Sequence, residues 1–325
     1  DMITREEAYK KAAEQIRQAQ KDKQRRYNML LAAAYGSNPR LLEIDREHAE
    51  VGARLVNAAL SGGKALDGLK KHSAALTLEK KLILEKADIK EPAPDCSICG
   101  DTGYVGGKIC GCVKRKAAEI MLSELSGEMP LESSRFDNFN LNYYKDEDGK
   151  GGNPRRRMTT ILKVCTEYVI GFDPKKSGNL LFMGSAGVGK THLTLAIVSS
   201  LIEKGFVPVY GSAENLFSKI EKEKFSGENR GAYESMTTCD LLVIDDLGAE
   251  MATAFTKSAL YNLVNTRLLS GKPTIINTNL TMKEIETRYT ARISSRLIGS
   301  FDAYKFIGDD IRQQKAVERI VRKGQ

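Results

Sequence analysis

Two kinds of hydrophobic pattern divide the chain near residue 155. Before it, apolar residues recur at helical spacing, as at Ala8, Ala12, Ile16 and Ala19, which predicts helices. After it, short apolar runs alternate with helical stretches, a pattern typical of buried parallel strands joined by helices. The runs are NLLFM, VPVY, LLVI and TIINT. We therefore predict a helical front followed by a parallel α/β sheet.

Local signals set the limits of the predicted helices in the front. Thr4 with Glu7 fits a capping box that opens a long first helix. Asn38 caps a second helix, with Pro39 at its first position and its end near Leu60. Three further segments are predicted: a flexible break at SGGKALDG, a short helix over TLEKKLILEKADI, and another over KRKAAEIML. The stretch KDEDGKGGNP (145–154) is predicted to be an exposed linker.

Composition adds limits on location and partners. The apolar runs of this 325-residue chain are far shorter than the ~18 residues that a membrane span needs. The amino terminus has no apolar signal-peptide core, so we expect a cytoplasmic protein without membrane contact. The net charge is +8, and residues 1–116 hold 22 Lys and Arg against 16 Asp and Glu, an excess of +6. A basic front fits nucleic acid or an acidic partner, and solvated helix faces fit it equally well.

The motif GSAGVGKT follows the strand NLLFM and opens a helix, which is the context that a phosphate-binding loop requires. Its glycines let backbone N–H groups wrap the phosphates of ATP or ADP at the helix amino terminus. Lys190 is predicted to reach the β- and γ-phosphates, and the Thr191 hydroxyl to bind Mg²⁺. The predicted nucleotide-binding residues here are Gly184, Ser185, Ala186, Gly187, Val188, Gly189, Lys190, Thr191 and His192.

Polar residues end two of the later predicted strands, at the sheet edge where ligands bind in such folds. Asp245 and Asp246 end LLVIDD, so we predict Asp245 as a magnesium ligand and Asp246 as the general base that polarises water. An amide at the end of TIINTN can orient that water. Both Asn277 and Asn279 are candidates, and we prefer Asn279 because it lies at the carboxyl end of the strand.

Four of the six cysteines lie in CSICGDTGYVGGKICGC, residues 96–112. Short spacings between paired cysteines in a cytosolic protein favour zinc over a disulfide. Four thiolates leave no open position on tetrahedral zinc, so Cys96, Cys99, Cys110 and Cys112 predict a structural site. A thioredoxin-like redox motif is the alternative, but its fold context is missing here.

Taken together, the phosphate loop, LLVIDDLG, TIINTNL, RISSRL, GDDIRQQK, the cysteine segment and RFDNFNLNYY resemble the AAA+ ATPases of the bacterial replicative helicase loaders, the DnaC/DnaI group. The resemblance covers about residues 94–323 and implies an α/β AAA+ P-loop core with a reduced lid, behind a helical domain with a zinc knuckle. It implies four segments: a partner-docking domain (1–93), the knuckle and the following helix (94–125), a linker that enters the adenine pocket (126–154), and the ATPase domain (155–325).

The resemblance also implies roles that spacing alone does not support. Arg296 would be an arginine finger inserted into a neighbouring subunit's site, Arg312 the sensor 2 residue and Asn279 sensor 1, while Phe136 and Phe139 would line the adenine pocket. Asp246 departs from most AAA+ proteins, which have Glu there, and this shortens the reach of the base.

By the same resemblance the chain would load the hexameric replicative helicase onto single-stranded DNA and self-associate through its ATPase domain. A nucleotide-gated DNA-binding adaptor, such as the helper ATPase of a transposase, shares the core motifs and stays open as the alternative. Basic and aromatic residues in NLFSKIEKEKFSGENRGAY could follow a DNA strand, although the acidic residues among them fit a solvated helix equally well.

Overall fold

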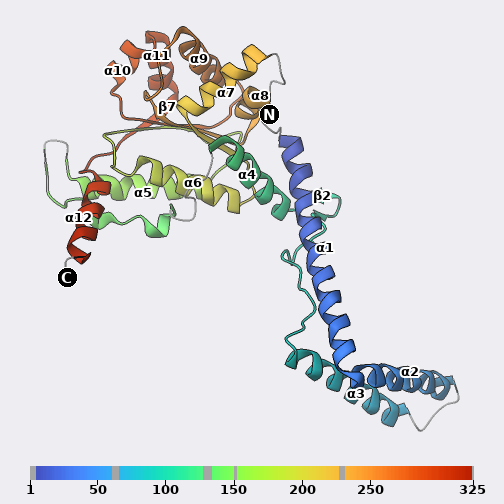
Figure 1. Cartoon of the computed structure of the whole chain (residues 1–325). Helices are drawn as coiled ribbons and strands as arrows, with labels where there is room; N and C mark the ends of the chain where they lie inside the picture. The colour runs from blue at the N-terminus through green and yellow to red at the C-terminus, as the bar shows by residue number, and fades with distance from the viewer. Residues whose placement is uncertain (1–4, 61–65, 127–133, 150–151, 227–230, 324–325) are drawn as a thin grey trace. The chain divides into compact units, whose positions relative to one another are not determined.

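The chain forms two compact units, one of Glu14–Val105 and the other of Asp1–Ala13 with Gly106–Gln325. The computed structural model describes residues 5–60, 66–126, 134–149, 152–226 and 231–323 (Figure 1). The predicted Thr4 capping box lies outside these residues. The functional limits of the four predicted segments stay predictions. No helix within the described ranges is both long enough and apolar enough to cross a bilayer.

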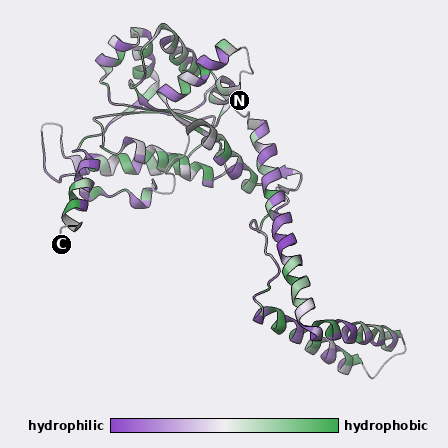
Figure 2. Ribbon diagram, viewed as in Figure 1, coloured by the Kyte–Doolittle hydropathy of each residue, from purple (hydrophilic) through white to green (hydrophobic). Residues whose placement is uncertain are grey.

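The front of the chain consists of the helices α1 (Arg5–Ser37), α2 (Pro39–Leu60) and α3 (Leu66–Lys86). Asn38 separates the first two, and its side-chain oxygen accepts a hydrogen bond from the Arg40 backbone N–H at 3.1 Å, as the sequence predicts for a cap. α2 and α3 pack together through a small core of Ile44, Val51 and Leu76. Figure 2 shows hydrophobic and hydrophilic residues interspersed along these helices, as expected for elements with one buried stripe.

The third helix begins at Leu66, so its predicted start within TLEKK was wrong. Leu69, in its first turn, packs against the core of α2 and α3, and this burial favours helix despite the neighbouring Gly68. Arg40 ties the two helices further, because its guanidinium donates to both carboxylate oxygens of Glu79, at 2.8 and 3.0 Å, and to Glu47 at 2.6 Å.

The second unit is built on a five-stranded parallel sheet of order β4-β5-β6-β3-β7. Its strands are β3 (Asn179–Met183), β4 (Pro208–Ser212), β5 (Leu241–Leu247), β6 (Thr274–Thr278) and β7 (Phe301–Lys305). The three inner strands are buried almost throughout, because helices cover both faces. Figure 1 shows α5 and α6 on one face and α7, α9, α10 and α11 on the other.

The helices of this unit are α4 (Gly111–Ser126), α5 (Pro154–Ile170), α6 (Lys190–Glu203), α7 (Ala213–Ser226), α8 (Gly231–Thr238), α9 (Ala254–Leu269), α10 (Met282–Arg288), α11 (Ala291–Ser300) and α12 (Ile311–Lys323). Two short 3-10 helices, η1 (Phe136–Asn138) and η2 (Leu141–Tyr143), precede α5. α5 begins where the predicted linker ends, with Asn153 as its cap and Pro154 at its first position. The predicted fold class, a parallel α/β core behind a helical front, is confirmed.

The sequence did not predict β7 or the small hairpin of β1 (Tyr104–Val105) and β2 (Lys108–Ile109). β7 is an edge strand whose FDAYK is buried at Phe301 and largely exposed beyond it, so it lacks a continuous apolar run. The hairpin strands have two residues each, too few for a periodic pattern. Gly106 and Gly107, with φ of 55° and 76°, form the two-residue turn between them.

Candidate functional site

The phosphate loop connects the end of β3 to the start of α6. Gly187 and Gly189 have φ of 76° and 95°, values that favour glycine. A Cβ atom at Gly189 would come within 2.7 Å of the Tyr144 hydroxyl, which donates to the Val188 carbonyl oxygen at 3.0 Å. The segment around η2 therefore packs directly against the loop, and larger residues in the loop are excluded by contact as well as by conformation.

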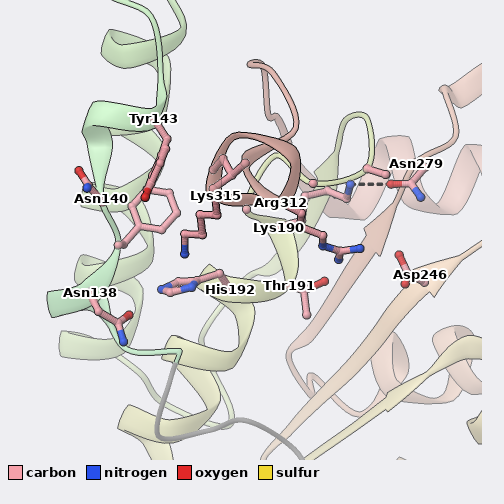
Figure 3. A pocket seen from close by; sticks show the side chains of 15 residues that line it. Asn138, Asn140, Tyr143, Lys190, Thr191, His192, Asp246, Asn279, Arg312 and Lys315 are labelled. Carbon is pink, nitrogen blue, oxygen red and sulfur yellow. Dashed lines mark hydrogen bonds between the residues drawn. The ribbon is translucent and has the colours of Figure 1, made fainter. Parts of the chain in front are cut away.

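Lys190 is held at the centre of the site. Its ammonium donates to the backbone carbonyls of Gly184 and Ser185, both at 2.8 Å, and to Oδ1 of Asn279 at 2.6 Å (Figure 3). Burial lowers the pKa of Lys190 and the Arg312 guanidinium adds to this, while the carboxylates of Asp246 and Asp245 oppose it. Three oxygen acceptors thus position one cation beside the loop, where it can contact phosphate oxygens.

The two aspartates at the end of β5 face different surroundings. Asp245 is buried, and its Oδ1 accepts from the Thr191 hydroxyl at 3.4 Å. Asp246 is exposed to the pocket and has φ of 51°. Between Ile244 and Leu247 the strand advances three residues while its partner β6 advances two, so a bulge turns the second aspartate out of the sheet. Burial raises the pKa of Asp246, and the Asp245 charge raises it further, against the lowering effect of Lys190 and Arg312.

The structure separates the two asparagine candidates for the water-orienting role. Asn279 lines the pocket and contacts Lys190. Asn277 is fully buried in β6, where its Nδ2 donates to Asp245 Oδ1 at 2.7 Å and its Oδ1 accepts from Thr194 at 3.0 Å. This geometry favours Asn279, which we preferred from its place at the end of the strand. Its role as a sensor stays a prediction.

Lys190, Asp246 and Asn279 line one pocket of about 260 Å³. Its phosphate end is lined by Ala186, Gly187, Gly189, Lys190, Thr191, Asp246, Asn279, Ile311 and Arg312. The other end is lined by Asn138, Phe139, Asn140, Tyr143, His192 and Lys315, and Figure 3 shows Tyr143, His192 and Lys315 on the side of the pocket away from Asp246. A charged end and an aromatic end fit the phosphates and the base of a nucleotide.

Phe139 is the adenine-pocket candidate that the structure brings to the site. Its ring lies 5.4 Å from that of His192 and 5.8 Å from that of Tyr144. Burial lowers the pKa of His192, which also contacts the Arg135 carbonyl oxygen at 3.0 Å. Phe136, also predicted to line the adenine pocket, is not among the described residues that line it. Arg296 is absent from this lining as well, which is compatible with its predicted place in the site of a neighbouring subunit.

The site offers magnesium the ligand atoms that this ion prefers. Mg²⁺ binds oxygen atoms together with substrate phosphates, and the Thr191 hydroxyl and the Asp245 carboxylate lie 3.4 Å apart at the phosphate end. These two residues would hold the ion, which neutralises phosphate charge when bound. The residues present therefore fit a magnesium nucleotide.

The cysteine segment forms a separate site. The Sγ atoms of its four cysteines all lie within 4.8 Å of one another, close to the spacing of about 3.8 Å that four Zn–S bonds of ~2.3 Å produce in a tetrahedron. Three of the cysteines are buried and Cys112 is half-buried. The buried Asp101 carboxylate accepts from the backbone N–H groups of Asp95 and Cys96, at 2.9 and 2.8 Å, and so holds the first turn of the knuckle. The four thiolates fit a structural zinc ion.

The knuckle provides a direct test. Chain purified without chelator is expected to contain about one zinc per molecule by mass spectrometry, because four thiolates fill the coordination of the ion. Cys96→Ser is expected to lose most of that zinc, whereas Cys165→Ser, at a buried cysteine on α5 outside the cluster, is expected to retain it. Folded wild-type chain with almost no metal would contradict a zinc knuckle.

The parallel sheet, the phosphate loop and the acidic strand end are together the features of a P-loop nucleotide-binding domain. Residues 168–314 match the family model of the IstB-like ATP binding proteins. The replicative helicase loader DnaC of Escherichia coli (strain K12) is 30% identical over 144 residues, which are 42% of this chain and 56% of that loader. The chain thus spans about half the length of the curated relatives it matches.

Two solved structures are also similar. The crystal structure of the DnaC helicase loader aligns with a TM-score of 0.44 and 22% identity, over 52% of this chain and 97% of that one. The crystal structure of DnaI aligns with a TM-score of 0.45 and 21% identity, over 56% and 93%. Residues 168–314 are thus similar to the IstB-like ATP binding proteins, and the match to the loader agrees with the resemblance of the motifs to the DnaC/DnaI group.

Several residues of the site were not predicted from the sequence. Tyr143 and Lys315 face each other at the base end, with the ammonium 5.5 Å from the ring centroid. Tyr210, on β4, donates a hydrogen bond to Oδ2 of Asp245. The motif RFDNFNLNYY marked the first of these segments, but nothing in the sequence distinguishes the Tyr210 side chain from an ordinary core residue.

Proposed function

We propose that this chain is an ATP-dependent helicase loader that docks on the hexameric replicative helicase and helps to place it on single-stranded DNA. The observation that carries the proposal is one pocket that gathers Lys190, Thr191, Asp246, Asn279 and Arg312 from separate segments. The sequence match to a helicase loader supports a role for ATP binding in helicase loading rather than in metabolism. ATP binding and hydrolysis would act as the switch.

In the proposed reaction each residue acts at a defined part of ATP. Lys190 and the loop N–H groups hold the β- and γ-phosphates, and Arg312 contacts the γ-phosphate from α12. Asp246 accepts a proton from the attacking water, which Asn279 orients. The raised pKa of Asp246 suits a base, because proton affinity rises with pKa. Arg296 would act in the site of a neighbouring copy of the chain.

The docking function is assigned to the helical front, as the resemblance implies. Several large apolar side chains of α2 and α3 are exposed, and a partner surface could cover them. The exposed ones are Leu42, Val56, Leu60, Leu78 and Leu82. Basic and aromatic residues of α7 would contact DNA: Phe225 is exposed on this helix, and the Lys224 ammonium lies 5.4 Å from the centroid of the Phe255 ring. Arg230, in the same sequence segment, is outside the described residues.

A capture experiment separates the loader from the alternative adaptor. Immobilised full-length chain with ATP and Mg²⁺ is expected to retain a bacterial hexameric replicative helicase and not a transposase. Lys190→Ala is expected to retain the helicase as well, because that residue lies in the ATPase core and not in the helical front. Capture of the transposase alone would overturn the loader and establish the adaptor, for which the IstB-like match is the supporting observation.

A further inference from the structure

The Asp245 carboxylate accepts hydrogen bonds from both neighbouring strands, β4 and β6. Asn277 on β6 donates to its Oδ1 at 2.7 Å, and the Tyr210 hydroxyl on β4 donates to its Oδ2. The backbone N–H of Asp246 adds a third bond, to Oδ1 at 3.0 Å. Asp245, Tyr210 and Asn277 are all buried, with exposed fractions of 4%, 8% and 0%. A buried carboxylate needs such donors, since burial without them is costly.

The sheet register explains why Tyr210 reaches this carboxylate. Asp245 pairs with Ser212 across β4 and β5, and Tyr210 lies two residues before Ser212. Side chains two residues apart point to the same face of a strand, so Tyr210 and Asp245 share a face as diagonal neighbours. The tyrosine ring spans that diagonal. A phenylalanine would fill the same space without the hydrogen bond.

The two carboxylate oxygens have different tasks. Oδ1 accepts from Thr191, the other residue that would hold magnesium, whereas Oδ2 is held by Tyr210. The terminal torsion of an aspartate is broad and roughly two-fold, so it provides little resistance to rotation of the carboxylate. Hydrogen bonds from the surrounding protein supply that resistance, and in metal sites the loss of such an outer contact typically costs about 10–100-fold in metal affinity or activity.

We propose that Tyr210 is a positioning residue of the magnesium–nucleotide site, which holds Oδ2 of Asp245 so that Oδ1 stays turned toward Thr191. This inference rests on the proposed function, because it requires that the pocket bind a magnesium nucleotide. It assigns to β4 a part in metal binding although that strand contributes no residue to the lining of the pocket within the described chain. Asn277 holds the same carboxylate from β6, on the other side of β5.

Tyr210→Phe tests the inference in the full chain. The affinity for a fluorescent ATP analogue is measured in EDTA and then across a range of Mg²⁺ concentrations. Mg²⁺ is expected to raise the affinity for the nucleotide, and the Mg²⁺ concentration that gives half of this increase is the quantity compared. In Tyr210→Phe that concentration is expected to rise about tenfold or more, as for other outer contacts of metal ligands. The affinity in EDTA is expected to stay at the wild-type value, because the phosphate loop is intact.

Tyr168→Phe is the matched control. The Tyr168 hydroxyl on α5 donates to the Gly178 carbonyl oxygen at 3.0 Å, so this variant also loses one hydroxyl hydrogen bond, but away from the pocket. It is expected to leave both affinities unchanged. The unfolding temperature of each apo variant verifies that it is folded. Asn277→Ala removes the hydrogen bond to Asp245 from β6, and it is expected to raise the Mg²⁺ requirement as Tyr210→Phe does.

The outcomes are distinguishable. A wild-type chain that binds the magnesium nucleotide, together with an unchanged Mg²⁺ requirement in Tyr210→Phe, overturns the inference and leaves the proposed function standing. Equal weakening in EDTA and in Mg²⁺ also overturns it, because that result shows a general structural role for the tyrosine. A wild-type chain that binds no magnesium nucleotide overturns the proposed function itself.

Discussion

Lys190→Ala is expected to remove measurable binding of the magnesium nucleotide. The ammonium is already placed by three oxygen acceptors, and no other side chain of the described phosphate loop brings a positive charge to its centre. Charge-assisted hydrogen bonds to phosphate contribute roughly 1.5–3 kcal/mol each. Loss of two of them corresponds to an affinity loss on the order of a hundredfold or more. Titration of a fluorescent ATP analogue measures this loss.

Lys204→Ala is the matched control for that experiment. Lys204 follows the end of α6, and its ammonium also donates to a backbone carbonyl, that of Val169 at 2.5 Å, outside the pocket. This variant is expected to bind nucleotide like the wild type. If Lys190→Ala retained wild-type affinity, the loop would not be the phosphate site. Deletion of residues 1–115 is expected to abolish helicase capture. If Lys190→Ala abolished capture as completely, docking could not be assigned to the helical front and nucleotide binding to the core.

Arg296→Ala is expected to abolish the stimulation of ATP hydrolysis that accompanies self-association, while nucleotide affinity stays near the wild-type value. Ile293 and Leu297 bury one side of α11, and Arg296 is half-buried on that helix. In the described chain Arg296 does not line its own pocket, so a γ-phosphate contact requires a second copy. An arginine finger supplied in trans contributes about 10³–10⁵ in rate in well-studied GTPases.

The measurement is turnover per chain as a function of protein concentration, with and without single-stranded DNA. The turnover per chain of the wild type is expected to rise with protein concentration, and that of Arg296→Ala to stay flat. Arg292→Ala, at an exposed arginine of the same helix, is the control and is expected to keep the rise. Mixing Arg296→Ala with Lys190→Ala should restore part of the activity, since one subunit supplies the lysine and the other the arginine. A wild-type turnover per chain that does not change with concentration, without rescue on mixing, would exclude a finger in trans.

The sequence predicted the features of this fold that depend on local pattern. β3, β6 and α6 have the predicted limits, because the strands are short apolar runs and GSAGVGKT between a strand and a helix specifies the local conformation. β5 continues three residues beyond the predicted run LLVI. The edge strand β7 was missed because one-sided burial leaves no apolar run to detect. Local pattern also failed at Leu66, where packing against α2 decides the start of the helix.

Contacts between distant segments could not be predicted in the same way. Asn277 and Asn279 are two residues apart on one strand end, and only the sheet places one beside Asp245 and the other beside Lys190. Phe136 and Phe139 both belong to the RFDNF segment, yet only the second lines the pocket among the described residues. Tyr210 lies 35 residues from its partner Asp245, and a tyrosine on a strand is commonly a core residue.

The bulge in β5 restricts which residues position 246 can hold. Its φ of 51° is a conformation that asparagine and aspartate adopt several times more readily than other residues with a side chain. A glutamate there would extend the carboxylate by one methylene and would strain the backbone. The short base and the extra residue in the strand are therefore linked, because exchange of aspartate for glutamate would add a conformational cost on the order of 1–2 kcal/mol as long as the bulge is kept.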